Sequence, residues 1–351
     1  MKKLLSSIFL IIVLFIITYF LFIFPFDIIN LWKVDKNFNG LFSFTSTLIT
    51  FILVRLYFST KITFTPLRLF VCEGIGIGFI SLNVIGIIFI LDLLYPLQGE
   101  TKVNLFLVFL IILLTIGYTS TIFIKVKTIE LQSKKIRNQK KIIFISDIHL
   151  GSNSINHFKK IIKKIILLNP DMILIGGDLI DSSSFQIDQL SILKEVKGPI
   201  YFVTGNHEYY LKNSNEKIDR LKEFNINLLD NKSSVIDDIN IIGVSDNQSV
   251  EKQKDIFFSK KNNNSYNLCL VHKPSLWQLI KEECDLTLSG HTHNGQILPF
   301  NLLVKLKFKE KFGLYESNLS FLYVSSGSGT WGPKLRLGSF NEVVSINLNP
   351  S

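Results

Sequence analysis

The stretch Met172–Asp181, with the sequence MILIGGDLID, holds the pattern that decides the fold of the larger part of the chain. Its first four residues are apolar, which is typical of a short strand buried on both faces. The two glycines that follow let the backbone turn tightly, and the carboxylate of Asp178 stands directly after them. A buried strand that ends in a glycine turn and an acidic residue predicts a ligand-binding loop at the edge of a sheet.

Four similar motifs lie on either side of this stretch, and each follows a short apolar run. They are Ser146-Asp147-Ile148-His149, Gly205-Asn206-His207-Glu208, Val271-His272 and Gly290-His291-Thr292-His293. Five of the six histidines of the chain fall in these motifs. The sixth, His157, lies in a polar helical stretch and is interpreted as an ordinary surface residue.

Strand and helix patterns alternate from residue 142 onward, which predicts a layered α/β domain. Apolar runs at Ile142–Ile145, Met172–Ile175 and Ile200–Val203 are separated by helical patterns over 156–168 and 184–196. Beyond residue 226 the pattern becomes rich in strands, which indicates a second sheet packed on the first, and hence a two-sheet α/β sandwich. The runs there are Val235–Ile236, Ile239–Val244, Leu268–Val271, Leu286–Leu288, Leu322–Val324 and Val343–Ile346.

The polar residues at the strand ends have the side chains that a two-metal hydrolytic site requires. Asp147 and His149 can project to one side of an extended segment, as can His291 and His293. Asp178 is the natural bridging carboxylate. The amide oxygen of Asn206 and the imidazole of His272 complete the set, although a lone histidine on an apolar strand is usually a core residue. None of these candidate ligands is a cysteine, which favours manganese, iron or another divalent ion over structural zinc.

The first third of the chain differs from the rest, because it is dominated by apolar residues. Four stretches, at 4–24, 41–58, 69–91 and 104–124, approach or exceed the ~20 residues that a spanning helix needs. The sequence therefore predicts three regions: a four-helix transmembrane region over 1–124, a basic juxtamembrane linker over 125–141, and a catalytic domain over 142–351. The first apolar run is too long for a signal peptide, and we interpret it as a retained helix.

The net charge of +10 is concentrated in one short segment. Residues 1–124 carry +3, residues 125–141 carry +6, and residues 142–351 carry only +1. A nucleic-acid-binding protein more often has a basic stripe on its folded domain, so no nucleic-acid partner is expected. A basic segment beside a membrane helix suits anionic lipid, at about 1 kcal/mol per basic residue near the surface.

The basic residues also predict the orientation of the helices. Those on the side that we place in the cytoplasm are Lys2, Lys3, Arg55, Lys61, Arg68, Lys125, Lys127, Lys134, Lys135, Arg137, Lys140 and Lys141. The other two loops carry fewer, namely Lys33, Lys36 and Lys102. We therefore expect a multi-pass protein of the bacterial cytoplasmic (inner) membrane whose catalytic domain faces the cytoplasm.

Glycines and cysteines add two smaller expectations. Gly74 and Gly78 form a GxxxG pair inside an apolar stretch, which favours close helix packing over a nucleotide loop. The three cysteines show no paired spacing: Cys72 sits in an apolar span, and we expect Cys269 and Cys284 to be buried thiols in a reducing compartment.

With these motifs in order, residues 141–348 resemble the calcineurin-like metallophosphoesterases. The likeness is greatest to a membrane-associated bacterial branch whose fourth block matches Gly290-His291-Thr292-His293-Asn294-Gly295-Gln296. The resemblance implies two divalent metal ions, with manganese favoured and iron or zinc as alternatives. One metal would be held by Asp147, His149, Asp178 and His293, and the other by Asp178, Asn206, His272 and His291.

The resemblance also implies roles for residues that do not bind metal. His207 would stand beside the phosphate, where it could protonate the leaving oxygen, and Asp181 would pair with it. The segment Ser325–Pro333 and Arg336 resemble a further block, and Arg336 would either contact substrate phosphate or form a structural salt bridge.

Lys305, Lys307, Lys309 and Lys311 alternate with apolar residues, which predicts a solvated strand face, with contact to anionic lipid as the functional alternative.

The function that this resemblance implies is that of a membrane-bound hydrolase. Its substrate would carry a phosphodiester or pyrophosphate bond, in a phosphorylated small molecule or in a lipid-linked nucleotide such as UDP-diacylglucosamine, which some similar proteins cleave. The alternatives are a general or cyclic-nucleotide phosphodiesterase that its helices merely anchor, and a non-catalytic scaffold that only binds metal. The sequence contains neither a GxSxG nor a GxxxxGK[ST] motif, so a serine hydrolase and a P-loop NTPase have no support.

Overall fold

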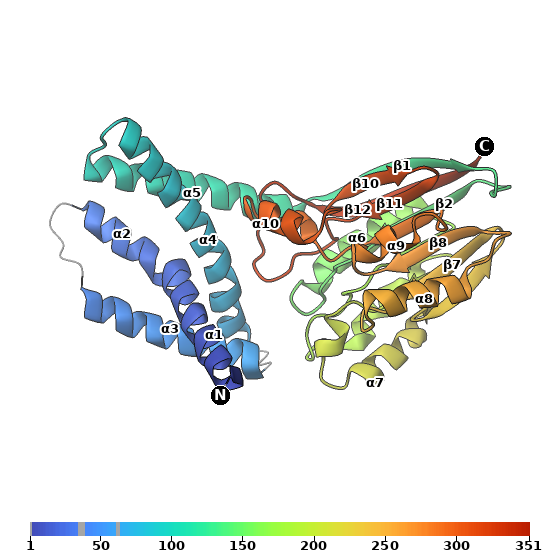
Figure 1. Cartoon of the computed structure of the whole chain (residues 1–351), viewed down its shortest axis with the longest axis horizontal. Coiled ribbons are helices and arrows are strands. Elements are labelled where there is room, and N and C mark those ends of the chain that lie inside the picture. Colours follow the sequence, from blue (N-terminus) through green and yellow to red (C-terminus); the bar gives the residue numbers. More distant parts are fainter. Residues whose placement is uncertain (1, 34–38, 61–63) are drawn as a thin grey trace. The chain divides into compact units, whose positions relative to one another are not determined.

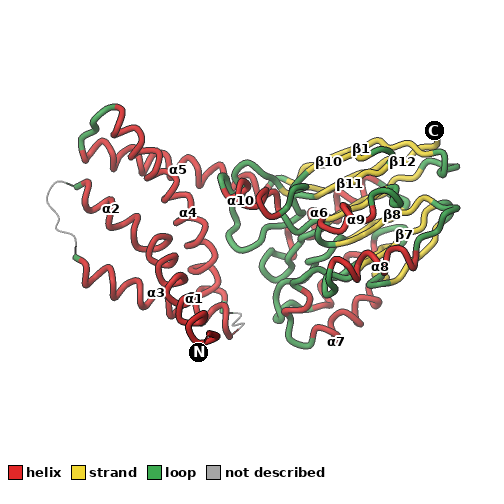
Figure 2. Tube along the Cα trace, viewed as in Figure 1, coloured by secondary structure: helices red, strands yellow, loops and turns green. Residues whose placement is uncertain are grey.

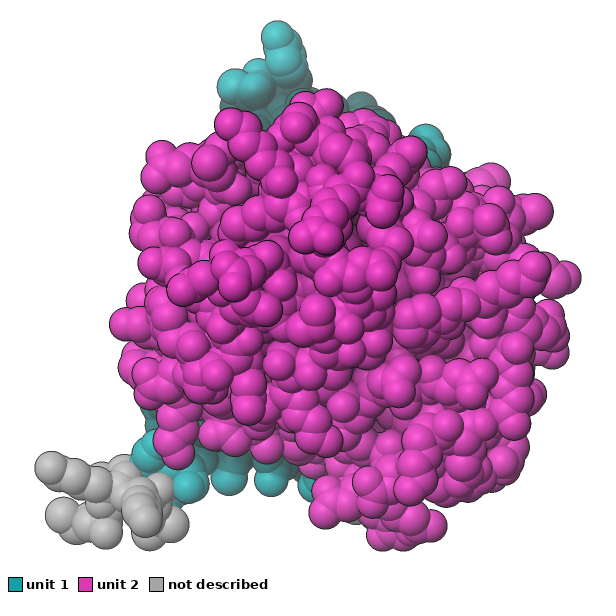
Figure 3. All heavy atoms as spheres, turned by 90° about the vertical axis from the view of Figure 1, so that its right-hand side faces the viewer, with its two compact units in different colours: residues 1–119, 332–335 teal, residues 120–331, 336–351 magenta. Residues whose placement is uncertain are grey.

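A computed structural model describes residues 2–33, 39–60 and 64–351 of the chain. The chain divides into two compact units, one made of residues 1–119 with 332–335 and the other of residues 120–331 with 336–351 (Figure 3). Lys36 and Lys61, which entered the prediction of orientation, lie outside the described residues, as do the side chains of Lys2 and Lys3.

The first unit contains four apolar segments that are long enough to cross a membrane, as the sequence predicts (Figure 1). The first of them reaches Trp32 rather than residue 24, because a short π-helix joins two α-helices into one segment. The elements are α1 (Lys2–Thr18), the π-helix η1 (Tyr19–Ile23), α2 (Phe24–Trp32), α3 (Gly40–Thr60), α4 (Thr65–Leu94) and α5 (Gly99–Ile122).

Close packing at the predicted GxxxG pair is confirmed where η1 meets α4. Pro25 has no N–H, so it cannot donate to the carbonyl of Leu21 one turn earlier. Gly78 packs against that carbonyl so closely that a Cβ atom would lie 1.9 Å from the Leu21 oxygen. Any side chain at position 78 would therefore separate the two helices.

The second unit is built on two mixed sheets of six strands each (Figure 2). The first sheet has the order β1-β12-β2-β3-β4-β5, and β2 to β5 run parallel. Its strands are β1 (Ile124–Ser133), β2 (Lys140–Ile145), β3 (Met172–Ile175), β4 (Ile200–Phe202), β5 (Ile226–Leu228) and β12 (Asn341–Pro350).

The second sheet has the order β10-β11-β9-β8-β7-β6, and β7, β8, β9 and β11 run parallel. Its strands are β6 (Lys232–Ile236), β7 (Ile239–Val244), β8 (Tyr266–Val271), β9 (Leu286–Ser289), β10 (Gly313–Ser317) and β11 (Ser320–Val324). The two sheets face each other across a core that includes Phe144, Leu174, Leu268 and Leu270, so the predicted sandwich is confirmed.

Helices cover the outer faces of the sandwich. Apolar residues of α6 pack on the first sheet, and Phe257 of α8 packs on the second. Ser154 caps the start of α6, and Asn169 ends it in the left-handed conformation. The helices are α6 (Ile155–Leu168), α7 (Ser214–Asp219), α8 (Val250–Lys260), α9 (Trp277–Ile280) and α10 (Phe300–Lys307), with short 3₁₀ turns at Ile187–Glu195, Glu208–Tyr210, Arg220–Phe224, Pro274–Leu276 and His293–Gly295.

The structure corrects four expectations. Residues 125–141 are not a separate linker, because 124–133 form strand β1, which pairs with β12 along its whole length. Strand β12 lies in the first sheet rather than the second. The helical pattern over 184–196 becomes a 3₁₀ helix at Ile187–Glu195, and the lysine-rich segment near residue 305 is helix α10 rather than a strand.

The core between α6 and the first sheet gives a direct test of the packing. Phe158 is fully buried there, whereas Leu167 on the same helix is 84% exposed. We expect Phe158→Ala to lower the stability of the full chain by about 3–5 kcal/mol, seen as a lower thermal unfolding midpoint in detergent. Leu167→Ala is the matched control and should leave the midpoint almost unchanged, and equal effects of the two substitutions would contradict the packing.

Candidate metal centre

The predicted ligands are brought together by five strand ends from the two sheets. Strands β2, β3 and β4 end level with one another, since Ile145 pairs with Ile175 and Ile175 with Phe202. Strands β8 and β9 end next to each other in the second sheet. The residues that follow these five strands are Asp147 and His149, Asp178, Asn206, His272, and His291 and His293. Loops from both halves of the sandwich therefore meet at one place.

A first cluster of possible metal ligands contains Asp147, His149 and His293. The Nε2 atoms of the two histidines lie 3.1 Å apart, and Nε2 of His293 lies 3.4 Å from Oδ1 of Asp147. All three residues are buried. Two imidazole nitrogens and a carboxylate oxygen at such short range form a suitable site for a divalent cation.

A second cluster contains Asp178, His272 and His291. Nε2 of His272 lies 3.2 Å from Oδ2 of Asp178 and 3.2 Å from Nδ1 of His291. The Nδ1 atom of His272 lies 2.8 Å from the carbonyl oxygen of Gly176. A hydrogen bond there keeps the proton on Nδ1 and leaves Nε2 as the free electron-pair donor that faces the cluster.

Asp178 belongs to the second cluster and also faces the first, as a bridging carboxylate must. Its Oδ1 atom accepts the backbone N–H of His207 at 2.9 Å. Its Oδ2 atom lies 3.2 Å from His272 and 3.8 Å from Nε2 of His149. One oxygen is thus held by the backbone, while the other is directed to both groups of ligands.

Two buried polar atoms in the site have no hydrogen-bond partner, namely Oδ1 of Asn206 and Nδ1 of His149. Buried oxygen and nitrogen atoms are nearly always bonded, so each exception needs an explanation. Coordination of a cation would satisfy the amide oxygen of Asn206, which is one of the predicted ligands. The donor set therefore fits the two divalent ions that the sequence predicts.

The backbone of the site is held in an uncommon conformation. Asp147, His149, Asp178, His291 and His293 all have positive φ angles, between +48° and +71°. Residues other than glycine rarely adopt this region, and such residues gather at functional sites where the surrounding structure holds them in place. At Gly177, with φ +89°, an added Cβ would lie 2.6 Å from Nδ1 of His272, so only glycine fits between the two loops.

His207 and Asp181 form a pair beside the clusters. Nδ1 of His207 lies 2.5 Å from Oδ1 of Asp181, and the hydroxyl of Ser152 donates to the other carboxylate oxygen. Burial acts to lower the pKa of His207, but the hydrogen bond with Asp181 and the charge of Asp178 outweigh it and raise the pKa to about 9. Burial acts to raise the pKa of Asp181, but the bond with His207 lowers it to about 2. The hydrogen bond between them thus favours the imidazolium form of His207 and the carboxylate form of Asp181.

Glu208 is a residue of the site whose role the sequence did not predict. It is fully buried, and its carboxylate accepts the backbone N–H groups of Asp178 at 3.0 Å, Ile180 at 2.9 Å and Gly205 at 2.8 Å. Burial raises the pKa of Glu208 to about 7, while its backbone donors favour the anion. In the sequence, only its place directly after His207 indicated that Glu208 belongs to the site. In the structure, its hydrogen bonds join the loops after β3 and β4.

Aromatic side chains near the site were not predicted either. The rings of Tyr210 and Trp331 lie 5.4 Å and 6.2 Å from the ring of His207. Trp331 is half exposed, and both its backbone N–H and its carbonyl bond to the side-chain amide of Gln296. His207, which is not one of the predicted metal ligands, thus has aromatic rings beside it.

Arg336 does not have the substrate-facing position that the sequence allowed. Its side chain is fully buried, and it donates to Oδ1 of Asn341, to Oγ of Ser339 and to the carbonyl oxygens of Ser326 and Gly329. Burial lowers the pKa of Arg336 to about 10, so the guanidinium stays charged. Its donors are engaged by the protein, and one of them bonds to the carbonyl oxygen of His293 at 3.4 Å. Arg336 therefore supports the position of His293 and is not an exposed contact for phosphate.

His157 also differs from its interpretation as a surface residue. Its Nε2 atom lies 2.6 Å from the carbonyl oxygen of Ser328. This hydrogen bond links helix α6 to the loop that Arg336 braces. Cys269 and Cys284 are free and buried, as expected, and Cys72 is free and buried as well.

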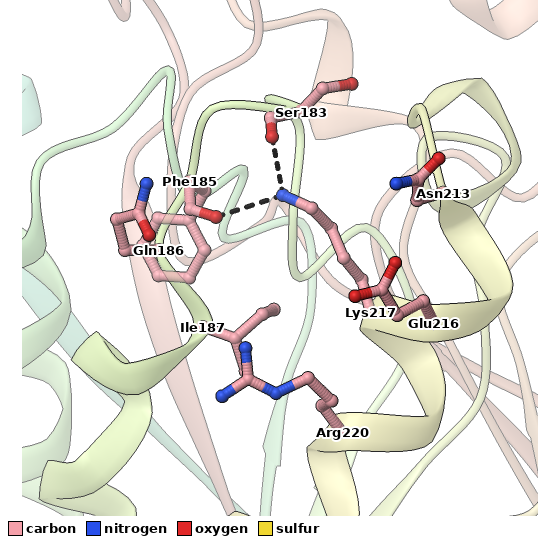
Figure 4. A pocket seen from close by; sticks show the side chains of 8 residues that line it. All are labelled: Ser183, Phe185, Gln186, Ile187, Asn213, Glu216, Lys217 and Arg220. Carbon is pink, nitrogen blue, oxygen red and sulfur yellow. Dashed lines mark hydrogen bonds between the residues drawn. The ribbon is translucent and has the colours of Figure 1, made fainter.

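A separate pocket of about 180 Å³ lies between residues 183–187 and the segment that contains α7 (Figure 4). Lys217 reaches across it and donates to the carbonyl oxygens of Ser183 and Phe185. None of the predicted metal ligands lines this pocket. The ammonium group of Lys217 therefore joins the loop after Asp181 to α7 through these two hydrogen bonds.

Comparison with known proteins agrees with this geometry. Residues 140–295 match the family model of calcineurin-like phosphoesterases. The chain is 38% identical to an uncharacterized metallophosphoesterase of Campylobacter jejuni, with 64% of this chain and 63% of the relative covered. It is 36% identical to one of Helicobacter pylori, with 64% of each covered. A transmembrane protein with a metallophosphoesterase domain from Bos taurus is 30% identical, over 60% of this chain and 53% of the relative.

The matched part spans less than two thirds of the length of these relatives. It includes the strand ends from β2 to β9 and all seven candidate ligands. The family model, the names of the relatives and the ligand clusters together support the assignment of this domain to the calcineurin-like metallophosphoesterases.

Proposed function

We propose that the protein is a membrane-bound hydrolase with two metal ions that cleaves a phosphodiester or pyrophosphate bond. The observation that carries this proposal is the position of Asp178, whose Oδ2 atom faces both ligand clusters. When bound there, two divalent cations would activate a water molecule and neutralise the charge of the phosphoryl group. We favour manganese because the ligands are oxygen and imidazole without thiolate.

The residues of the chain supply proton transfer and positioning. Nε2 of His207 lies 3.9 Å from Oδ2 of Asp178, so this edge of the ring faces the phosphoryl site. The raised pKa keeps His207 protonated at neutral pH, and it can then donate a proton to the leaving oxygen. Asp181 holds the ring in this orientation through Nδ1. Glu208 and Arg336 hold the ligand loops from behind.

For the substrate, we propose a lipid-linked phosphate compound such as the nucleotide sugar UDP-diacylglucosamine. The four candidate membrane spans support this choice, because they would confine the enzyme and its substrate to one surface. The exposed ring of Trp331 near His207 suits a planar leaving group. We place the protein in the bacterial cytoplasmic membrane with its catalytic domain in the cytoplasm, based on the distribution of basic residues.

A substrate screen tests the proposal. Purified full-length chain with manganese would be assayed on a phosphomonoester, a soluble phosphodiester and UDP-diacylglucosamine. We expect hydrolysis of the lipid-linked pyrophosphate. Asp178→Asn should lower turnover by at least about 100-fold, since supporting residues of metal sites alone account for 10–100-fold, and it should also lower the bound metal measured by elemental analysis.

The same screen separates the alternatives. Cleavage of soluble diesters with no action on the lipid substrate would identify a general phosphodiesterase and remove the lipid part of the proposal. A loaded protein that hydrolyses none of the three substrate classes, with Asp178→Asn equal to the wild type, would contradict the hydrolytic function itself.

The pair of His207 and Asp181 predicts the alkaline side of the pH profile. Because the carboxylate favours the imidazolium, Asp181→Asn should lower the pKa of His207, and activity should then decline at lower pH than in the wild type. His207→Gln should lose about 10²–10⁴-fold in turnover, and less on a p-nitrophenyl ester, whose leaving group needs little protonation. An unchanged alkaline limb in Asp181→Asn would show that His207 is not the acid.

The orientation has its own test. A reporter that is active only in the cytoplasm, fused after Ser351 of the full chain, should give a signal. A reporter that works only outside the cytoplasm should stay silent at the same position. The opposite pair of results would place the catalytic domain on the other side of the membrane.

A further inference from the structure

We propose that helix α10 docks on an anionic lipid surface through a leucine face made of Leu302, Leu303 and Leu306, and that this contact presents lipid-linked substrate to the metal centre. The second part of this inference rests on the proposed hydrolytic function. The first part concerns the surface alone and can be tested without any substrate.

The leucine face has the composition of an interfacial helix. At 3.6 residues per turn, its three leucines fall within an arc of about 100°. They are 61%, 57% and 85% exposed. Lys305 and Lys307 lie on the two flanks of this arc. Three large apolar side chains side by side in water are unfavourable, and such a patch usually marks a contact surface.

The charge around the leucine face selects an anionic partner. Lys305, Lys307 and Lys309 are exposed, and the one acidic residue between Phe300 and Lys311, Glu310, is buried and bonded to the amide of Gln278. Lysine side chains can lay their apolar stems along a lipid surface while their ammonium groups reach headgroup phosphates. Leucines flanked by lysines on one helix therefore fit a bilayer with anionic headgroups.

The chain also keeps this domain close to a bilayer. Helix α5 ends at Ile122 and strand β1 begins at Ile124. A connection of one residue between a candidate membrane span and the first sheet cannot act as a long tether. A lipid surface is therefore a partner that is always within reach of the domain.

The segment that directly follows helix α10 is attached to the loop that carries two of the candidate ligands. The hydroxyl of Thr292, between His291 and His293, donates to the carbonyl oxygen of Lys311 at 2.5 Å. Just after the helix, the ring of Phe308 lies 5.3 Å from the ring of His291. A lipid bound at α10 would thus lie beside the metal loop, which gives the docking surface a role in substrate delivery.

The docking surface can be tested on the full chain in lipid nanodiscs. The native cysteines are buried, so Leu306→Cys provides a reactive site for an environment-sensitive fluorophore. Leu167→Cys, at a position of almost equal exposure on α6, is the matched control. In discs with anionic phosphatidylglycerol, we expect lipids that carry a quencher on the acyl chain to quench the label at position 306 and to leave the label at position 167 unaffected.

Two results would overturn the docking. One is a label at position 306 that stays in water in anionic discs. The other is a label that is shielded from water but not quenched by the lipid, which would show that a protein surface covers α10, either a second copy or another part of this chain. Strong quenching that persists in discs without anionic lipid would overturn the role of the lysines.

A second measurement tests substrate delivery. We expect the double substitution Leu303→Ser and Leu306→Ser to lower turnover of UDP-diacylglucosamine in nanodiscs by several-fold and to leave hydrolysis of a soluble diester unchanged. Equal loss on both substrates would indicate damage to the metal loop and contradict delivery. If the wild type cleaves neither substrate, the hydrolytic proposal fails, while the quenching result still decides the docking.

Discussion

The close approach of histidine and aspartate side chains around Asp178 is the constraint on which the rest of this unit depends. A buried carboxylate must be compensated by hydrogen bonds or positive charge. Here one oxygen of Asp178 takes a backbone N–H, and the other faces the imidazoles of His149 and His272. Cations between these candidate ligands would stabilise such an arrangement, and metal binding would then be coupled to the fold.

The surrounding structure holds the ligand loops in a conformation that they would not adopt alone. Five of the candidate ligands have positive φ angles, and two buried ionisable residues, Glu208 and Arg336, hold the loops that carry them. Glu208 joins the backbones of the loops after β3 and β4, and Arg336 donates to the carbonyl oxygens of His293, Ser326 and Gly329. Neither residue is a candidate ligand, yet both hold the loops that carry the candidate ligands.

The sequence was sufficient for features that depend on local pattern. An apolar run that is followed by Gly-Gly-Asp or Gly-Asn-His predicts both a strand and a polar loop after it. The candidate ligands could therefore be predicted from the sequence, and the structure brings them together. Features that depend on distant pairing were missed. Strand β1 has exposed residues at many positions and reads as a basic linker, and only its partner β12 makes it a strand. The burial of Arg336 and the position of Glu208 likewise arise from loops that are far apart in sequence.

Helix α10 shows the same limit and also what the structure adds. Lysines that alternate with apolar residues indicate a strand with one solvent-exposed face, because the alternation has the period of two that is typical of strands. In a helix the same residues separate differently, since Leu302, Leu303 and Leu306 come to one side and the lysines to its edges. The exposed leucines then have no explanation within the domain itself. The four apolar helices and the candidate metal loop beside this helix support the lipid contact that we propose, because a lipid-linked phosphate would need both surfaces at once.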